Sequence, residues 1–187
     1  MGRTIRPRCR EDCRSRANFH FGRNFRGFCQ PTSDSLRENF RYLGKFPASQ
    51  EYSRGWDLNE TLLFVYGTLR PGCDDPMARW LRNAARHVGP AIAQGWLYRV
   101  GTYPGFVPDG SGVVTGDLFA LSDPEPVLAA LDDYEECAAH FPPPHEYRRE
   151  RLTVRCEHGQ VEAWTYIYMP DSRGLKRIKS GDFLARE

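Results

Sequence analysis

The amino-acid sequence predicts a mixed α/β (α+β) fold in which a largely antiparallel, barrel-like sheet is flanked by helices. Short apolar runs bounded by turn residues predict strands, and two longer segments have the apolar spacing of helices. From residue 59 onward the predicted order is β, α, β, β, α, β, β. The longest connection contains a helix, while other neighbouring strands have the pattern of hairpins, which favours a largely antiparallel or barrel-like sheet over a doubly wound parallel one.

The five predicted strands share a mixture of apolar and polar residues and end at glycine or other turn signals. The turn-rich stretch TYPGFVPDGSG (residues 102–112) is predicted to be a long connection between two of them. The predicted strands are TLLFVYG (61–67), IAQGWLYRVG (92–101), GVVTGDLFAL (112–121), EYRRERLTVRC (146–156) and VEAWTYIYM (161–169).

The first helix is predicted over residues 74–89, with Pro76 in its first turn and Gly89 just past its end. Its apolar face is predicted to consist of Met77, Trp80, Leu81, Ala84 and Val88.

The second helix is predicted over residues 122–136, with Ser122 or Asp123 as N-cap and Pro124 at its start. The following stretch CAAHFPPPHE contains three prolines, so it is predicted to be a loop.

The charge distribution divides the 187-residue chain near residue 58. Residues 1–58 carry 12 Lys and Arg against 6 Asp and Glu, whereas residues 59–187 carry 14 against 18. The first segment also lacks a sustained helical or strand period. We therefore predict a basic, disordered extension over residues 1–58 and one domain over residues 59–187.

Other interpretations of residues 1–58 remain open from the sequence. The alternation of Arg with Phe suits phosphate contact and base stacking, as in an arm that binds RNA or DNA. The segment also contains one candidate helix (34–43), and it need not be a natural part of the domain. Its Cys and His residues allow a zinc site to be drawn, although their spacing matches no standard finger: Cys9, Cys13, His20 and Cys29.

Deletion of residues 1–58 is expected to leave a domain that unfolds cooperatively, because the composition and the periodicity both change at this boundary. Thermal unfolding of residues 59–187 alone, compared with the full chain, checks this. Loss of the cooperative transition in the shortened chain would mean that the extension packs on the domain.

No stretch of the sequence approaches the roughly 18 consecutive apolar residues of a membrane helix. The charged N-terminus is followed by no apolar segment typical of a secretory signal. These patterns predict a cytoplasmic protein with no membrane partner. Free thiols are then expected at all six cysteines, which are Cys9, Cys13, Cys29, Cys73, Cys137 and Cys156.

Four acidic residues stand close together in LAALDDYEEC (residues 128–137). On a helical wheel of about 100° per residue, Glu135 falls inside the apolar stripe and Asp132 at its edge, while Asp133 and Glu136 face away. A carboxylate in an apolar wall has a raised pKa and suits general acid–base catalysis near neutral pH. A frayed last turn or a salt bridge from Glu135 to an arginine is the alternative.

The stretch FVYGTLRPG (residues 64–72) indicates a sharp turn where a strand ends. Gly67 permits such a turn, and successive N–H groups there can form an anion-binding nest. The stretch lacks the second glycine and the Gly-Lys-Ser/Thr ending of a phosphate-binding loop. An ordinary strand exit is the alternative.

No covalent nucleophile stands out in the sequence, and no Gly-x-Ser-x-Gly motif occurs. Cys73 or Cys137 could pair with a histidine, with His87, His140 and His145 as candidates. A metal site can be sketched from Cys137, His140, His145 and Glu146, although the intervening prolines favour a rigid loop.

Six stretches resemble, in order and spacing, the gamma-glutamylcyclotransferase-like family, in particular its AIG2-like and gamma-glutamylamine cyclotransferase branch. The resemblance covers roughly residues 61–185 and none of residues 1–58. The combination of Tyr-Gly-Thr-Leu with a later Leu-Asp-x-Tyr-Glu is fairly specific. The stretches are FVYGTLRPG, GWLYRVGTYPGFV, GDLFAL, LAALDDYEE, EYRRERLTV and AWTYIY.

The resemblance implies a compact fold with a mixed barrel-like sheet and a cavity, and a cofactor-independent enzyme that releases 5-oxoproline, of transferase or lyase type. It implies that Glu135 is the catalytic acid/base and that no metal takes part. It also implies a small gamma-glutamyl compound as the partner. It implies neither a nucleic-acid partner nor a particular oligomeric state. The substrate-binding residues it implies are Tyr66, Gly67, Thr68, Leu69 and Tyr147.

One departure from the family concerns the residue after the glutamate, where the family commonly has Gly and this chain has Glu136. A second negative charge there would push the pKa of Glu135 further up, or the local turn would differ. Two other functions stay open from the sequence. These are a non-catalytic member of the same fold that binds a small molecule, and a nucleic-acid-associated protein that uses its Arg-rich arm.

Overall fold

Five strands close into a barrel in the computed structural model, which describes residues 60–109 and 111–185. All neighbouring pairs are antiparallel except β1 and β7, which run parallel. The predicted fold class is thereby confirmed. Around the barrel the strands are β1 (Thr61–Val65), β5 (Val113–Leu121), β2 (Arg86–Gln94), β6 (Tyr147–Cys156) and β7 (Gly159–Tyr168).

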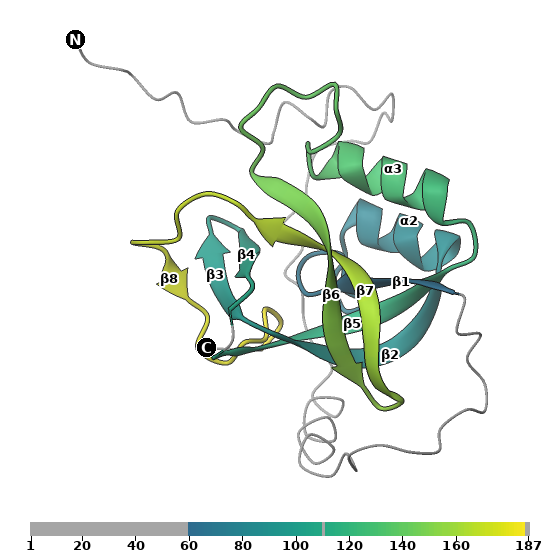
Figure 1. Cartoon of the computed structure of the whole chain (residues 1–187), viewed down its shortest axis with the longest axis horizontal. Helices are drawn as coiled ribbons and strands as arrows, with labels where there is room; N and C mark the ends of the chain where they lie inside the picture. Colours follow the sequence, from purple (N-terminus) through teal and green to yellow (C-terminus); the bar gives the residue numbers. More distant parts are fainter. Residues whose placement is uncertain (1–59, 110, 186–187) are drawn as a thin grey trace.

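Two helices and a small sheet flank the barrel. Figure 1 shows helices α2 (Pro76–Ala84) and α3 (Pro124–Tyr134) together above the barrel, with the small sheet to the left of the barrel. That sheet has the order β4 (Tyr103–Val107), β3 (Trp96–Val100) and β8 (Lys176–Arg177), and its pairs are antiparallel.

Strand β1 is apolar from Leu62 to Val65 because both of its faces are covered. Leu62 and Phe64 belong to the core inside the barrel. Leu63 and Val65 point the other way and pack with residues of α2 and α3. Successive side chains of a strand alternate between faces, so an uninterrupted apolar run is what a strand between two cores requires.

Helix α2 ends at Ala84, so the helix predicted to continue toward Gly89 is too long. Asp75 caps its start, where Oδ1 accepts hydrogen bonds from the amides of Met77 (2.8 Å) and Ala78 (3.4 Å). From Arg86 onward the chain is strand β2, paired with β5.

Strand pairing is the physical reason for this early end. The register with β5 shifts between His87 and Gly89, so the glycine that looked like a helix stop is part of an irregularity in a strand. Trp80, predicted to lie on the buried face, keeps 37% of its surface exposed.

The stretch predicted as one strand over residues 92–101 is divided at Gly95, whose φ of +145° few other residues adopt. A Cβ at this position would lie 2.5 Å from Phe106 Cε2 and from the carbonyl oxygen of Val107. Glycine thus allows β2 to end and β3 to start in a different sheet.

The turn-rich connection predicted over residues 102–112 contains strand β4, which the sequence interpretation missed. Val100 pairs with Tyr103, so Gly101 and Thr102 form a two-residue hairpin loop in which Gly101 has a φ of +62°. Glycine is favoured in two-residue hairpin loops because it adopts positive φ readily. Gly101 therefore gave a hairpin signal that could have been read from the sequence.

Helix α3 and the last hairpin agree with the sequence prediction. Asp123 is the N-cap of α3, although its side chain makes no capping hydrogen bond. The predicted loop after α3 precedes β6, which forms a long hairpin with β7.

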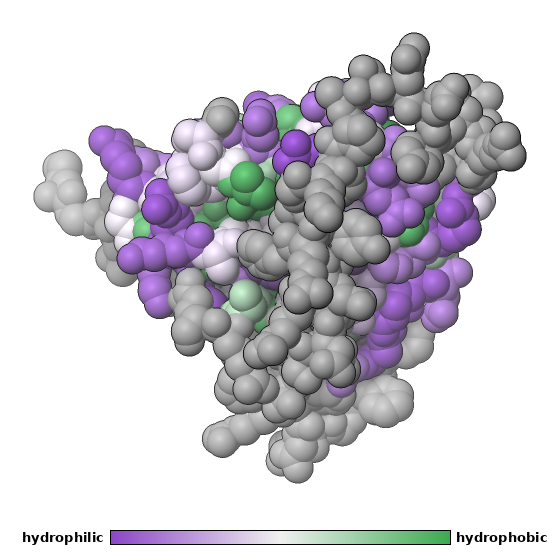
Figure 2. All heavy atoms as spheres, turned by 90° about the horizontal axis from the view of Figure 1, so that it is seen from below, coloured by the Kyte–Doolittle hydropathy of each residue, from purple (hydrophilic) through white to green (hydrophobic). Residues whose placement is uncertain are grey.

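The predictions for residues 1–58, including the zinc site and the short helix, lie outside the described residues. Within residues 60–109 and 111–185, no helix is long and apolar enough to cross a membrane. The described residues on the face drawn in Figure 2 are mainly hydrophilic, with small hydrophobic groups between them. The large hydrophobic side chains that are exposed in this part of the chain are Trp80, Val113 and Met169.

Candidate functional site

A pocket that is open to solvent lies where β1 ends. Its walls come from five parts of the chain: the end of β1 with the turn after it, β4, the end of α3, β6 and β7. The lining contains all six residues that the family resemblance implies as catalytic or substrate-binding. It consists of Phe64, Val65, Tyr66, Gly67, Thr68, Leu69, Tyr103, Pro104, Glu135, Tyr147 and Tyr166.

The turn after β1 is held by hydrogen bonds from the residues that follow it. The amide of Arg70 donates to the carbonyl of Gly67 (3.1 Å), and the amide of Cys73 donates to that of Arg70 (2.9 Å). Within the described part of the chain, the amides of Thr68 and Leu69 make no such bond. Both residues line the pocket.

Gly67 is required here for close packing, and not for the sharp backbone turn that the sequence suggested. Its φ does not lie in the left-handed region. A Cβ on Gly67 would lie only 2.7 Å from Cγ and 3.1 Å from Cδ of Pro104. The turn thus rests directly against strand β4, the strand that sequence reasoning missed.

Hydrogen bonds orient the tyrosines of the pocket wall. The Tyr66 hydroxyl donates to the carbonyl of Tyr166 (2.7 Å), and the Tyr147 hydroxyl donates to that of Pro104 (2.9 Å). The rings of Tyr66 and Phe106 lie 5.3 Å apart in a tilted arrangement. These contacts give the pocket an aromatic wall of defined shape.

Glu135 reaches the pocket from the last turn of α3, where it is the C-cap residue. Its amide still donates to the carbonyl of Leu131 (2.9 Å). Val127, Leu128 and Leu131 are buried on the same helix, as the helical wheel predicts. Asp133 is exposed. The helical wheel placed Glu135 in the apolar stripe and Asp133 facing away from it, and the structure agrees.

The backbone conformation of the residue after Glu135 explains why a glycine is favoured at this end of α3. Glu136 has a φ of +53°, in the left-handed region. The amide of Cys137 donates to the carbonyl of Asp132 (2.9 Å), and that of Glu136 donates to the carbonyl of Asp133 (3.2 Å). This is the hydrogen-bond pattern of a Schellman motif. The helix end therefore keeps the turn that glycine would form, although the residue is glutamate.

Glu136→Gly is expected to stabilise the protein by about 0.5–1 kcal/mol. Removal of Cβ relieves a left-handed conformation that costs about 1–2 kcal/mol, while glycine loses part of that gain through the entropy of the unfolded chain. Thermal and denaturant unfolding measure the difference. Glu136→Ala is the matched control, because it removes the charge and keeps Cβ. An equal gain in both variants would point to charge repulsion as the cause.

Asp132, which the wheel left at the edge of the stripe, is part of the wall behind the pocket. Its Oδ1 accepts a hydrogen bond from the Tyr166 hydroxyl (2.8 Å), and its Oδ2 lies 3.1 Å from Nη1 of Arg149. Burial and the charge of Asp132 raise the pKa of Tyr166, so this hydroxyl stays protonated and donates. Tyr166 was not singled out from the sequence, because only the fold brings β7 beside α3.

The structure does not favour the cysteine nucleophiles that the sequence left open. Cys137 is partly buried, and burial together with the charges of Asp132 and Glu135 raises its pKa to about 12. A thiol with such a pKa is scarcely ionised at neutral pH. Cys73 is buried and its Sγ lies 3.7 Å from the carbonyl oxygen of Gly67. Cys73, Cys137 and Cys156 form no disulfide with one another.

The metal site sketched from Cys137, His140, His145 and Glu146 is not assembled. No group of three or more His, Cys, Asp or Glu side chains in residues 60–109 and 111–185 could hold a metal ion. His145 Nε2 lies 3.1 Å from the carbonyl oxygen of Phe141, and the Glu146 carboxylate accepts a hydrogen bond from Tyr103 (2.9 Å). The described residues therefore give no support to this alternative.

Comparison with known proteins agrees with this geometry. The model of the family described as gamma-glutamyl cyclotransferase, AIG2-like, matches residues 63–185. The gamma-glutamylcyclotransferase family protein YtfP of Escherichia coli K12 is 34% identical over 125 residues, which cover 67% of this chain and 97% of YtfP.

Two solved structures show the same fold. YkqA from Bacillus subtilis has a TM-score of 0.51 at 24% identity, over 66% of this chain and 39% of YkqA. An AIG2-like protein from Mus musculus has a TM-score of 0.50 at 22% identity, over 64% of this chain and 86% of the mouse protein. The family match spans both helices, every part of the pocket lining and all of the barrel except the first two residues of β1. The chain belongs to the gamma-glutamyl cyclotransferase, AIG2-like family.

Proposed function

We propose that this protein is a gamma-glutamyl cyclotransferase that converts a gamma-glutamyl amide into 5-oxoproline and a free amine or amino acid. The observation that carries the proposal is that one small pocket brings Glu135 to the turn at Gly67, Thr68 and Leu69. A carboxylate and unengaged backbone amides are the two kinds of group that this reaction needs.

The reaction needs no nucleophile from the protein, because the substrate supplies its own. Glu135 takes a proton from the substrate's α-ammonium group, and the resulting amine attacks the γ-carbonyl carbon of the same molecule. A carbon–nitrogen bond forms and closes a five-membered ring, while the carbonyl electron pair moves onto oxygen. Holding the chain in a folded conformation makes this attack intramolecular, which is worth orders of magnitude in rate.

Collapse of the tetrahedral intermediate completes the reaction. The carbonyl re-forms, the bond to the original amide nitrogen breaks, and protonated Glu135 returns its proton to that nitrogen. The carboxylate then takes the second proton of the ring nitrogen and passes it to the released amine, which leaves as an ammonium ion. No water is consumed and the carboxylate is regenerated. Backbone N–H groups of the turn, with those of Thr68 and Leu69 as candidates, would bind the γ-glutamyl group and stabilise the oxyanion.

The aromatic wall fits this role. The rings of Tyr66, Tyr103 and Tyr147 line the pocket and limit its width, and Pro104 packs closely against Gly67 of the turn. In this assignment Tyr147 contributes shape through its ring, because its hydroxyl is bonded to the Pro104 carbonyl.

Release of 5-oxoproline from a panel of gamma-glutamyl amines and gamma-glutamyl amino acids tests the proposal. The purified Glu135→Gln variant, prepared in parallel, is the blank for contaminating host enzymes. Turnover of at least one panel member by the parent chain alone supports the proposal. Binding of 5-oxoproline or of a panel member without any turnover would instead identify a non-catalytic member of the fold.

Dialysis against EDTA is expected to leave the turnover unchanged. In the proposed mechanism the Glu135 carboxylate carries every proton, and backbone amides stabilise the negative charge of the oxyanion. The rate of 5-oxoproline release before and after dialysis is the measurement. Activity that is lost on dialysis and restored by zinc would overturn the metal-free assignment.

A further inference from the structure

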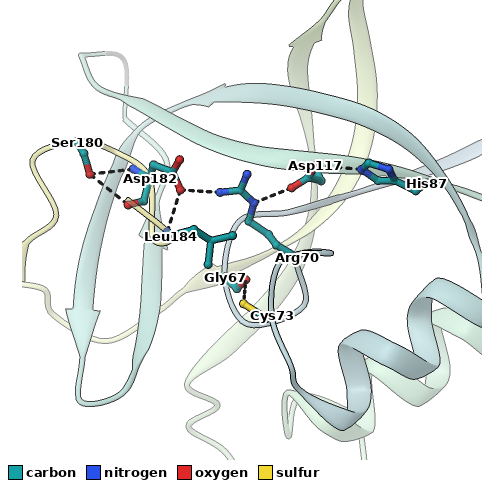
Figure 3. Close-up of polar contacts among 8 residues, drawn as sticks. All are labelled: Gly67, Arg70, Cys73, His87, Asp117, Ser180, Asp182 and Leu184. Carbon is teal, nitrogen blue, oxygen red and sulfur yellow. Dashed lines mark hydrogen bonds and ion pairs between the residues drawn. The ribbon is translucent and has the colours of Figure 1, made fainter. Parts of the chain in front are cut away.

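Arg70, the residue directly after the turn of the pocket, lies in a buried ionic cluster that the proposed reaction does not use. Its Nε donates to Oδ2 of Asp117 and its Nη1 donates to Oδ1 of Asp182, both at 2.6 Å. Figure 3 shows the guanidinium between the two carboxylates. Arg70, Asp117 and Asp182 expose only 6%, 8% and 5% of their surfaces.

The two carboxylates come from distant parts of the chain. Asp117 lies on β5, where it pairs with Val65 at the end of β1, and it is 47 residues from Arg70. Asp182 lies 112 residues away in the C-terminal segment, which we define as residues 178–185. Arg70 thus joins the turn of the pocket to the barrel and to the end of the described chain.

Both partners are themselves held in place. His87 Nε2 lies 3.0 Å from Oδ1 of Asp117 (Figure 3). Oδ1 of Asp182 also accepts a hydrogen bond from the Leu184 amide (2.9 Å), and the Ser180 hydroxyl donates to the Asp182 carbonyl (3.1 Å).

The C-terminal segment is anchored to the same barrel strand. The amide of Thr115 donates to the carbonyl of Gly181 (2.8 Å). Gly181 has a φ of +66°, and a Cβ there would lie 1.9 Å from the carbonyl oxygen of Val113. The segment and β5 are therefore in backbone contact, so Asp182 is a rigid partner for the guanidinium.

The charges of the cluster favour the ionised forms of Arg70 and Asp117. Burial alone would lower the pKa of Arg70, but the charges of Asp117 and Asp182 outweigh burial and raise it. Burial would raise the pKa of Asp117, but the His87 hydrogen bond and the Arg70 charge hold it below its ordinary value.

Stability alone is a weak reason for such a cluster, because buried ion pairs often add no more stability than apolar residues of the same volume. The guanidinium is planar, and its two bonds to separate carboxylates fix its orientation. The Arg70 amide closes the turn on Gly67, so a fixed Arg70 also fixes the direction of the amides before it.

We propose that Arg70 is a positioning residue, which uses Asp117 and Asp182 to hold the amides of Thr68 and Leu69 in the orientation that the pocket requires. This inference rests on the proposed function for its kinetic consequence, but the rigidity of the turn can be measured without any substrate.

Arg70→Lys and Asp182→Asn test the proposal in the full-length protein. Lysine keeps the positive charge but cannot bond both carboxylates in a fixed plane. Asparagine keeps the shape and an oxygen for the Leu184 amide, and it removes one charge. Val154→Ala is the matched control, since Val154 is buried on β6 inside the barrel and does not line the pocket.

Amide hydrogen exchange, followed by NMR, reports on the turn through the bonded amides of residue 70 and Cys73. The exchange rate of these two amides is measured relative to that of core amides of β6 in the same variant. This ratio is expected to be at least tenfold higher in Arg70→Lys and Asp182→Asn than in Val154→Ala. With an active parent, kcat/KM for 5-oxoproline release is expected to fall by about 10–100-fold in the first two variants only.

Unchanged exchange at residue 70 and Cys73 in the folded Asp182→Asn variant would overturn the proposal, even if Arg70→Lys does not fold. Equal acceleration in Val154→Ala would also overturn it, because the cluster would then act only through global stability. With a parent that releases no 5-oxoproline, the exchange result still decides about Arg70, so the two proposals fail separately.

Discussion

Glu135→Gln is expected to lower the rate of 5-oxoproline release by about 10²–10⁴-fold, or more because one residue serves two proton transfers. Glutamine keeps the size of the side chain and its capacity for hydrogen bonds, but it accepts no proton from the substrate ammonium. Glu135 lines the pocket from the end of α3, and the helical hydrogen bond from its amide to the Leu131 carbonyl is a backbone bond that glutamine keeps. Unfolding temperature and affinity for 5-oxoproline are expected to stay near those of the parent.

The neighbouring acids supply controls. Asp133→Asn and Glu136→Gln are expected to cost far less, because Asp133 is exposed and neither residue lines the pocket. Asp132→Asn is expected to be intermediate, since it weakens the bonds to Tyr166 and Arg149 and disturbs the wall behind the site. Near-normal turnover by Glu135→Gln would reject the general-base assignment. A Glu136→Gln variant without activity would mean that the acid/base role lies one residue later.

Gly67→Ala is expected to reduce kcat/KM by about 10–100-fold, because a displacement of the turn by about 1 Å can cost a factor of 10². The new Cβ would lie 2.7 Å from Cγ of Pro104, a ring on a paired strand that cannot rotate away. The turn must therefore move, and overpacking of this kind costs about 1–3 kcal/mol of stability. Steady-state kinetics and thermal unfolding measure the two effects.

Gly72→Ala is the control for this change. It adds the same methyl group in the same loop, but that group meets only the flexible end of Leu184 at 3.1 Å. Pro104→Ala combined with Gly67→Ala is expected to recover part of the lost kcat/KM, because the smaller side chain leaves room for Cβ. Parent-like kinetics of Gly67→Ala alone would show that contact with Pro104 does not position the turn.

Sequence patterns are sufficient for the parts of this protein that depend on neighbouring residues. The apolar run of β1, the β6–β7 hairpin and helix α3 follow from periodicity and from turn residues. The position of Glu135 in the pocket follows from its spacing to Leu131 and Leu128 along one helix. Local spacing decides these features because each one is completed within a few residues of the chain.

Tertiary contacts decide what the spacing leaves open. Residues 86–89 could continue a helix, but pairing with β5 makes them strand, because ladder hydrogen bonds outweigh small differences in helix propensity. Strand β4 carries Tyr103 and Pro104 into the pocket only because it pairs with β3 in a second sheet. The partners of Arg70 lie 47 and 112 residues away. No local pattern encodes such distances, so the fold alone assembles the surroundings of the turn.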